Sequence, residues 1–237
     1  MKRTKRVVHG LLLSLVLAQS VRAQAQEEPA DAVFGVKGHL VIGGERMFGY
    51  GHTRQDETSD GSTRTTTLNT VSFLGAALST SSLSSSLSAY TFPRVGVDAF
   101  VAPSISLGGS VTYFRVSSSA GGIDETQSGV LVAPRAGFAV RLAPAIWLWP
   151  RAGITYVHVW TDFGGSIQPS SGSASLFAAT VEVPVVLALA PHALALIGPT
   201  VDVGLSGSSK VTDGGSTFNY DLKETDIGLQ ASFMFYF

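Results

Sequence analysis

The sequence contains no cysteine, which excludes both disulfide-stapled scaffolds and zinc sites built from cysteine ligands. Charged residues are also scarce: Asp, Glu, Lys and Arg make up 14% of the 237 residues, whereas a typical soluble domain carries about 25%. The formal net charge of −1 gives no indication of a nucleic-acid partner. The low charge therefore argues against an ordinary soluble protein with a charged surface.

Hydrophobic and small residues are abundant instead. Hydrophobic residues reach 45%, which is more than a disordered chain would carry. The chain also has 26 Gly and 29 Ser, so small polar positions are plentiful beside the apolar ones. We interpret this combination as that of a protein whose outside faces lipid and whose inside is polar.

The first 25 residues have the pattern of an export signal. A basic segment, Lys2–Arg6, precedes an apolar stretch, Val7–Ala18, that is too short for a membrane-spanning helix. Small residues then indicate cleavage after Ala25 or after Ala23. We expect a signal peptide at 1–25, a short N-terminal periplasmic segment at 26–34 and the folded domain at 35–237.

Three short turns share an Ala-Pro dipeptide between apolar arms, with the prolines at Pro103, Pro144 and Pro191. Longer polar segments rich in Gly, Ser, Thr and Asp alternate with them, at 117–128, 161–175 and 206–224. Short turns on one side and long loops on the other are typical of outer-membrane barrels. The apolar stretch 183–201 contains three prolines, so we interpret it as a hairpin rather than a helix.

Apolar residues alternate with small or charged residues along the arms. The sequence contains eight such arms, at 36–50, 91–101, 105–116, 129–142, 146–160, 175–189, 193–205 and 225–237. In lipid, only a closed ring of strands satisfies every backbone group. The sequence therefore predicts an all-β, eight-stranded antiparallel transmembrane β-barrel, with 52–90 as a long first extracellular loop. A ten-strand alternative would place 67–74 in the membrane, and Glu45-Arg46 leaves the phase of the first strand open.

These features resemble the small outer-membrane β-barrel proteins of Gram-negative bacteria, the OmpA/OmpX-like class, over about residues 33–237. The sharpest piece is the C-terminal strand, which ends in an aromatic residue and has apolar residues at every second position before it. The resemblance implies an outer-membrane location and implies that Phe233, Phe235 and Phe237 are an assembly signal for the barrel-assembly machinery. The class varies widely in function, so the resemblance says little about this chain's role.

A second repeat, Pro-Arg-x-Gly, occurs within the strands at Arg94, Arg135 and Arg151. Alternation and distance from the turn prolines predict a lumen charge network made of Arg94, Asp98, Arg135, Arg151, Glu182, Asp202 and Asp226. The lumen of an eight-stranded barrel is just wide enough for side chains to fill it, and buried charges require partners. We expect the three arginines to pair with Glu182, Asp202 and Asp98. The neighbouring glycines would leave room for the guanidinium groups.

Aromatic residues and histidines are the remaining candidates. We expect Trp147 and Trp149 in an aromatic girdle near a short turn, with packing in the interior as the alternative because they share the phase of Arg151. We expect Tyr156 and Trp160 near the opposite rim. His158 lies where a lipid hydrolase could carry a base, but the sequence offers no specific nucleophile or orienting group.

The sequence predicts an integral outer-membrane protein with a structural or surface-interaction role and a charge-filled lumen. The alternatives are a narrow channel for small solutes and, less favoured, an outer-membrane lipid hydrolase. We expect no enzyme activity, cofactor, metal or nucleic-acid partner. The expected partners are outer-membrane lipid and the barrel-assembly machinery during insertion, and the expected state is a monomer.

Overall fold

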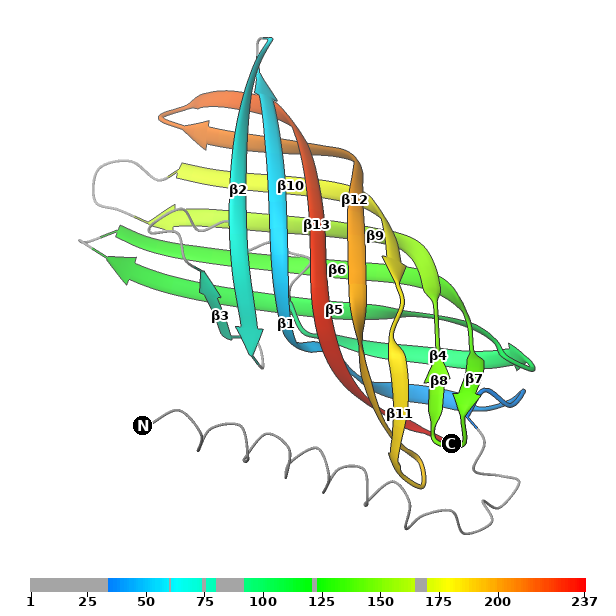
Figure 1. The fold of residues 1–237 in the computed structure, drawn as a ribbon. Coiled ribbons are helices and arrows are strands. Elements are labelled where there is room, and N and C mark those ends of the chain that lie inside the picture. The colour runs from blue at the N-terminus through cyan, green and yellow to red at the C-terminus, as the bar shows by residue number, and fades with distance from the viewer. Residues whose placement is uncertain (1–33, 60, 74–75, 80–91, 121–122, 165–169) are drawn as a thin grey trace, which may run out of the picture. The chain divides into compact units, whose positions relative to one another are not determined.

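The computed structural model describes residues 34–59, 61–73, 76–79, 92–120, 123–164 and 170–237 (Figure 1). The predicted signal peptide and most of the predicted periplasmic segment lie outside these residues. In the described part of the chain, no helix is long and apolar enough to cross a membrane. The regular elements of this part are all β-strands, which confirms the predicted all-β class.

The described residues form thirteen strands: β1 (Leu40–Ser59), β2 (Ser62–Phe73), β3 (Ala76–Ser79), β4 (Arg94–Ala102), β5 (Ile105–Ala120), β6 (Ile123–Phe138), β7 (Val140–Ala143), β8 (Ile146–Leu148), β9 (Arg151–Gly164), β10 (Ser170–Glu182), β11 (Val185–Ala190), β12 (Ala193–Asp213) and β13 (Ser216–Tyr236). Eight of them pair antiparallel in a closed ring, in the order β1-β4-β5-β6-β9-β10-β12-β13 and back to β1. The predicted eight-stranded barrel is therefore confirmed, and the strands β2 and β3 lie outside the ring.

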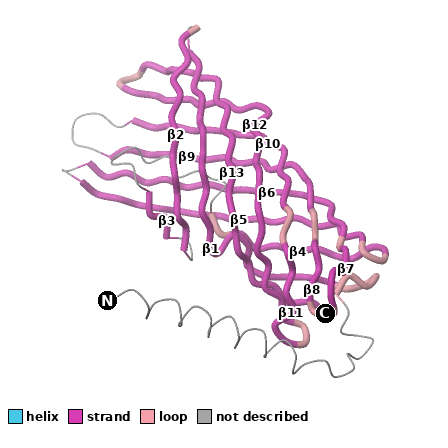
Figure 2. The backbone as a smooth tube through the Cα atoms, in the orientation of Figure 1, coloured by secondary structure: helices cyan, strands magenta, loops and turns pink. Residues whose placement is uncertain are grey.

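The remaining short strands extend ring strands across local interruptions. β7 follows β6, β8 precedes β9, and β11 follows β10, and Figure 2 marks the breaks as short non-strand stretches. Two breaks coincide with Pro150 and Pro184, which have no backbone N–H to donate. Their carbonyl groups still accept bonds across the wall, from the N–H of Phe138 (2.9 Å) and of Trp149 (2.9 Å). The wall therefore stays bonded at the prolines that are awkward in a regular strand.

Strand β1 changes one of its partners midway. As far as Glu45 it pairs with β4, and from Phe48 onward it pairs with β2 instead. It pairs with β13 throughout, but the register shifts between Gly44 and Phe48. Arg46 lies in this bulge with a φ of 52°, a left-handed backbone conformation that residues other than glycine rarely adopt.

Several segments expected as loops are strands in the structure. Much of 52–90 is occupied by the second half of β1 together with β2 and β3. The polar segments at 117–128, 161–175 and 206–224 likewise extend the strands of three hairpins. Their Ser, Thr and Gly content suggested loops, but threonine suits a strand and long hairpins tolerate polar side chains outside lipid. We call this side of the barrel the hairpin end, and the side with the Ala-Pro turns the turn end.

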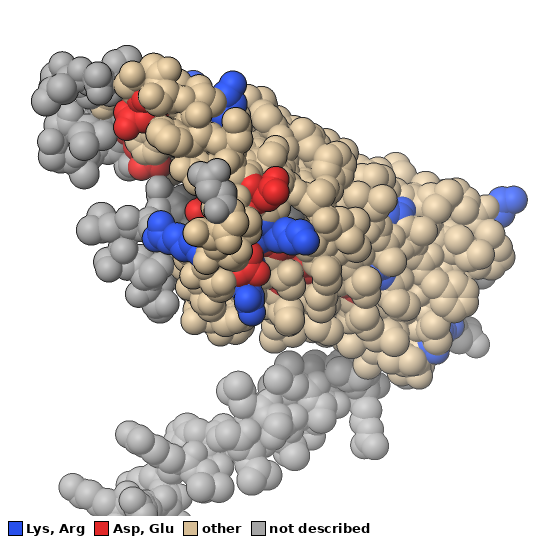
Figure 3. Space-filling model, turned by 90° about the horizontal axis from the view of Figure 1, so that it is seen from above, with Lys and Arg blue, Asp and Glu red and all other residues tan. Residues whose placement is uncertain are grey.

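The outer surface of the ring is apolar between these two ends. Figure 3 shows that uncharged side chains cover most of one face and that most acidic and basic ones gather toward one part of it. The outward positions carry aliphatic and aromatic side chains that are each 45–57% exposed, among them Val95, Leu107, Val111, Val132, Ile154, Phe177, Val181, Leu205, Ile227, Leu229 and Phe233. A continuous surface of this kind is suited to hydrocarbon, as predicted for a transmembrane barrel.

Candidate functional site

The interior of the barrel contains three layers of side chains. Toward the turn end it is filled by residues that are at most 2% exposed: Val41, Phe100, Trp147, Trp149, Leu194, Leu196, Met234 and Tyr236. Toward the hairpin end it is filled by an apolar cluster of Leu131, Ala133, Val157, Leu176, Ala178 and Leu222. Between them lies the charged layer, which we define as Glu45, Arg46, Arg94, Asp98, Arg135, Arg151, Glu182, Asp202 and Asp226.

The charged layer follows the tilt of the strands. Directly opposed residues lead once around the wall, through Val41, Asp98, Gly108, Arg135, Gly153, Thr180, Asp202, Asp226 and Thr53. The row starts at Val41 of β1 and returns to the same strand at Thr53, twelve residues farther along. The β13 residues opposite these two positions, Tyr236 and Asp226, are only ten residues apart. The difference of two is the bulge in β1. Strong tilt therefore places charges from distant sequence positions in one spiral row.

Glu45 is the centre of one half of the layer. Its carboxylate accepts hydrogen bonds from both terminal nitrogens of Arg135, at 2.7 and 2.6 Å, and from Nη1 of Arg151 at 2.7 Å. Arg135 also donates to Asp98, with Nε at 3.1 Å from Oδ1 and Nη2 paired with Oδ2. Two-pronged pairing of this kind suits the planar guanidinium group.

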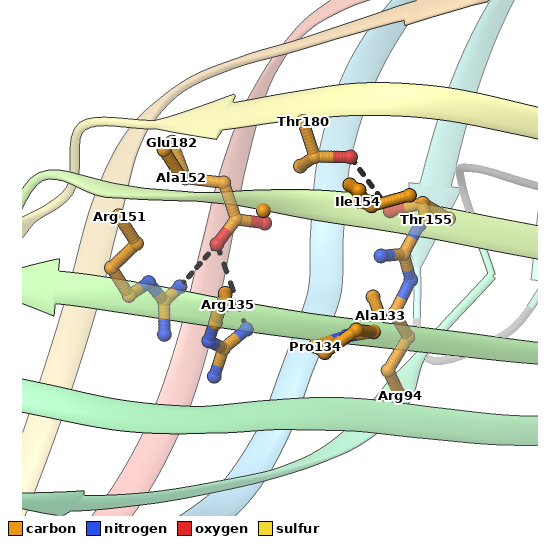
Figure 4. A pocket seen from close by; sticks show the side chains of 11 residues that line it. Arg94, Ala133, Pro134, Arg135, Arg151, Ala152, Ile154, Thr155, Thr180 and Glu182 are labelled. Atoms are coloured by element: carbon orange, nitrogen blue, oxygen red, sulfur yellow. Dashed lines mark hydrogen bonds and ion pairs between the residues drawn. The ribbon is translucent and has the colours of Figure 1, made fainter.

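Glu182 joins this half to a second group of charges. Its Oε2 lies 2.7 Å from Nη2 of Arg151 and 3.6 Å from Nη1 of Arg135 (Figure 4). Its Oε1 accepts a bond of 3.2 Å from Arg46, whose Nη1 donates to Asp202 at 2.9 Å. Seven charges of the layer are therefore linked in one network that reaches from β1 to β4, β6, β9, β10 and β12: Glu45, Arg46, Asp98, Arg135, Arg151, Glu182 and Asp202.

Threonine hydroxyls complete the layer on its hairpin side. Thr180 donates to Asp202 at 2.5 Å and lies 2.6 Å from the hydroxyl oxygen of Thr155. Thr53 donates to Asp226 at 2.7 Å. Buried carboxylates require such donors, because an unpaired charge in a low-dielectric interior is strongly unfavourable.

All seven residues of the predicted lumen network lie inside the barrel. Arg94, Asp98, Arg151, Glu182, Asp202 and Asp226 are each at most 5% exposed, and the side chain of Arg135 is 6% exposed. The structure brings Arg135 and Arg151 together with Asp98 and Glu182, as expected. Asp202, which was expected to pair with one of the three arginines, pairs with Arg46, a partner that the sequence did not predict.

The sequence reasoning missed Glu45 and Arg46, which are the two charges at the centre of the network. Both are 2% exposed although they are consecutive, because the bulge turns two successive side chains inward. Strict alternation would place one of them in lipid. The interruption of alternation at this dipeptide was the available signal, and its physical meaning is a bulge.

Glycines on the inner face make room for the layer, as expected. A Cβ atom at Gly153 would lie 2.8 Å from the Cβ of Arg135 and 2.1 Å from the carbonyl oxygen of Pro134. A Cβ atom at Gly96 would lie 2.6 Å from the carboxyl carbon of Glu45. The backbone of the barrel wall can therefore lie this close to Glu45 and Arg135 only because these positions are glycines.

Described residues line two small cavities beside the layer. One is lined by Arg94, Arg135, Arg151, Thr155, Thr180 and Glu182 (Figure 4), and the other by Glu45, Arg46, Arg151, Glu182, Thr200 and Gln230. Each has a volume of about 10 Å³, which is room for roughly one water molecule. These cavities can hydrate the network but are too small for a solute.

The expectation that Trp147 and Trp149 form an aromatic girdle is wrong. They are 2% and 0% exposed and lie inside the barrel, because their phase is that of Arg151. The guanidinium carbon of Arg151 lies 4.7 Å from the ring centre of Trp149, and the indole N–H donates to Ser106 at 3.1 Å. Packing of these rings in the interior, where Trp149 contacts the guanidinium group of Arg151, is therefore favoured over a position at the membrane interface.

The outer face carries a second candidate group. Nδ1 of His158 lies 2.6 Å from Oγ of Ser175, and the ring of Trp160 packs on His158 at 4.4 Å. A serine hydrolase also requires a group that orients the histidine. Among the described residues, none of the hydrogen bonds or ion pairs of His158 involves a carboxylate, so the pair lacks that component. Nor does any group of three or more His, Asp or Glu in this part of the chain have the spacing to hold a metal ion.

Other predicted positions are also accounted for. Trp160 is 43% exposed and Tyr156 is half-buried on the outer face. Phe233, Phe235 and Phe237 point outward and are 47%, 53% and 67% exposed. Their role as an assembly signal stays a prediction.

One electrostatic effect lies outside the membrane-spanning part, in the β1–β2 hairpin. The hydroxyl of Thr65 donates to the carboxylate of Asp56 at 2.6 Å, and Nε of Arg54 lies 3.3 Å from it. The bond from Thr65, followed by the bond and charge of Arg54, lowers the pKa of Asp56 below its ordinary value. The hairpin is therefore better bonded when this carboxyl is ionised.

Comparisons with known proteins show likeness at the level of structure. No protein-family model matches the chain, and no curated protein matches it. Similar solved structures include Ail, the attachment invasion locus protein of Yersinia pestis (13% identity, 84% of this chain and 100% of that chain, TM-score 0.37). They also include the outer membrane protein OprG from Pseudomonas aeruginosa (11% identity, 85% and 97%, TM-score 0.45). A third is the outer membrane protease OmpT from Escherichia coli (9% identity, 86% and 98%, TM-score 0.42). At these values none of their activities carries over to this chain.

Proposed function

We propose that this chain is a non-conducting, non-enzymatic outer-membrane barrel that contributes to envelope structure and to surface interactions through its hairpin end. The observation that carries the proposal is the filled lumen. Aromatic side chains, the charged layer and an apolar cluster follow one another along the axis, and each cavity beside the layer has room for about one water molecule.

The hairpin end supports the second part of the proposal. Strands β1, β2, β5, β6, β9, β10, β12 and β13 continue beyond the apolar belt as polar, hydroxyl-rich hairpins. Hydroxyl pairs link neighbouring strands, for example Thr58 with Thr63 at 3.0 Å and Thr212 with Thr217 at 3.3 Å. A rigid scaffold that presents ordered polar hairpins is suited to contact other molecules at the cell surface.

Conductance in planar lipid bilayers tests the proposal. Purified barrels should insert, which heat-modifiable migration on gels verifies, and should give no discrete current steps. A wide barrel reconstituted in the same way supplies the positive control. Reproducible current steps from this chain would refute the sealed lumen and favour the narrow channel instead.

The insertion step has its own test. We propose that Phe233, Phe235 and Phe237 direct recognition by the barrel-assembly machinery, since they form a continuous aromatic outward face at the chain end. Phe237→Ser should reduce the amount of barrel in the outer membrane without changing refolding into lipid vesicles. Equal loss in both assays would indicate a role in stability rather than recognition.

A further inference from the structure

The alternation of lipid-facing residues does not fix how β1 pairs with β13 at the seam that closes the ring. Beyond the bulge, Tyr50 lies opposite Leu229 and His52 lies opposite Ile227, all facing outward. A slip of one residue would turn apolar side chains inward, but a slip of two residues keeps every outward position outward. The hydrophobic pattern therefore permits two registers.

The bulge decides between these registers. Between Gly44 and Phe48, β1 advances four residues while β13 advances two, from Phe233 to Ala231. Without the bulge, Tyr50 would face Ile227 instead of Leu229. Both partners are apolar and outward, so lipid contact does not favour either pairing.

Arg46 distinguishes them. In a regular ladder it would follow the inward Glu45 and would therefore point into lipid, where a guanidinium group is strongly disfavoured. In the bulge it is 2% exposed, inside the barrel, and bonded to Asp202 and Glu182. The backbone adopts a left-handed φ of 52° at this residue to bring it there.

We propose that Arg46, through Asp202 and Glu182, selects the register of the β1–β13 seam. Replacing buried ion pairs by apolar residues is often neutral for stability, whereas fixing a register is their best-attested structural use. Here the partners lie on β10 and β12, neither of which pairs with β1. The bonds of Arg46 therefore fix the position of β1 relative to β10 and β12, and in this way determine how β1 pairs with β13.

Disulfide trapping tests the proposal directly, because the chain has no native cysteine. Tyr50→Cys with Leu229→Cys reports the bulged register, and Tyr50→Cys with Ile227→Cys reports the slipped one. Opposed residues of antiparallel strands are close enough for a disulfide. The pair Ile42→Cys with Phe235→Cys lies before the bulge and controls for seam formation.

With Arg46 present, the 50–229 product should exceed the 50–227 product by at least about tenfold, because moving a guanidinium into lipid shifts an equilibrium by more than that. In Arg46→Leu the 50–227 product should become the major one, while Arg46→Lys should retain 50–229. Exclusive 50–229 product in Arg46→Leu barrels would overturn the proposal.

A second variant covers the case in which Arg46→Leu yields no barrel. Asp202→Asn with Glu182→Gln leaves β1 unchanged but removes both charged partners, and it should lower the ratio of 50–229 to 50–227 product at least several-fold. An unchanged ratio in this variant, with the 42–235 control pair formed, would also overturn the proposal.

Discussion

Replacing Glu45 by glutamine should test the energetic importance of the charged layer most directly. Glutamine keeps the size and one acceptor oxygen of the side chain but removes its charge. Three N–H groups from Arg135 and Arg151 bond to Glu45 at 2.6–2.7 Å, in an interior where Glu45 is 2% exposed. Breaking a buried pair by removing one charge typically costs about 3–5 kcal/mol.

The lower end of that range applies here, because both arginines keep another carboxylate. Arg135 retains Asp98, and Arg151 retains Glu182. We therefore expect Glu45→Gln to lower the free energy of unfolding by about 3 kcal/mol, which corresponds to roughly a hundredfold change in the unfolding equilibrium constant.

Equilibrium urea unfolding in phospholipid vesicles, followed by tryptophan fluorescence, measures this change. Asp162→Asn removes an exposed carboxylate of β9 and should change stability by no more than about 0.5 kcal/mol. The effect of Glu45→Gln should also be insensitive to salt, because buried pairs are weakly screened. A loss below about 1 kcal/mol, or one that disappears at high ionic strength, would refute the reasoning.

Three further predictions address the interior, the aromatic residues and the hairpin end. Gly153→Ala should destabilise the barrel by about 1–3 kcal/mol in the same urea assay, because its Cβ would lie 2.1 Å from a backbone carbonyl oxygen. In single-tryptophan variants, brominated lipids should quench Trp160, which is 43% exposed, and should leave Trp149, which is fully buried, unquenched. The pKa of Asp56, measured by NMR titration, should lie below its ordinary value and should rise in Thr65→Val. Since ionisation is favoured in the folded hairpin, the associated stabilisation should be present above the ordinary carboxyl pKa and lost as pH falls through the lowered one.

Each of these has a contrary outcome. Gly172→Ala is the matched control for Gly153→Ala, since its nearest neighbour atom would be 3.5 Å away, and equal effects of the two would contradict the packing argument. Quenching of Trp149 by brominated lipids would contradict its burial inside the barrel and favour a position in an aromatic girdle. An unchanged pKa of Asp56 in Thr65→Val would show that the hydroxyl bond does not set it.

The eight ring strands could be predicted from sequence because lipid on the outside requires apolar residues at alternate positions, while the inward positions between them carry small, polar or charged residues often enough to show the period. Arg94, Arg135 and Arg151 were placed in the lumen by the same rule, with the short turns as reference points. Alternation fails at the bulge in β1, where two consecutive side chains point inward, and for this reason Glu45 and Arg46 were missed.

Two other features were missed for different reasons. Trp147 and Trp149 share the inward phase of Arg151, but their composition suggested a membrane interface, and only the packed interior shows that phase decides. The strand extensions at the hairpin end depend on pairing between polar segments, for which the sequence offers no apolar face to follow.

The connections made by β1 also bear on when the interior can form. Glu45 bonds to a residue 90 positions away in the chain, and Arg46 to one 156 positions away. Contacts of such high sequence separation require most of the chain to be in place first, and proteins dominated by them fold slowly. We therefore expect the charged layer to form late in folding. Before the layer forms, its arginines and carboxylates lack these partners, so we expect them to stay in contact with water rather than enter the hydrocarbon.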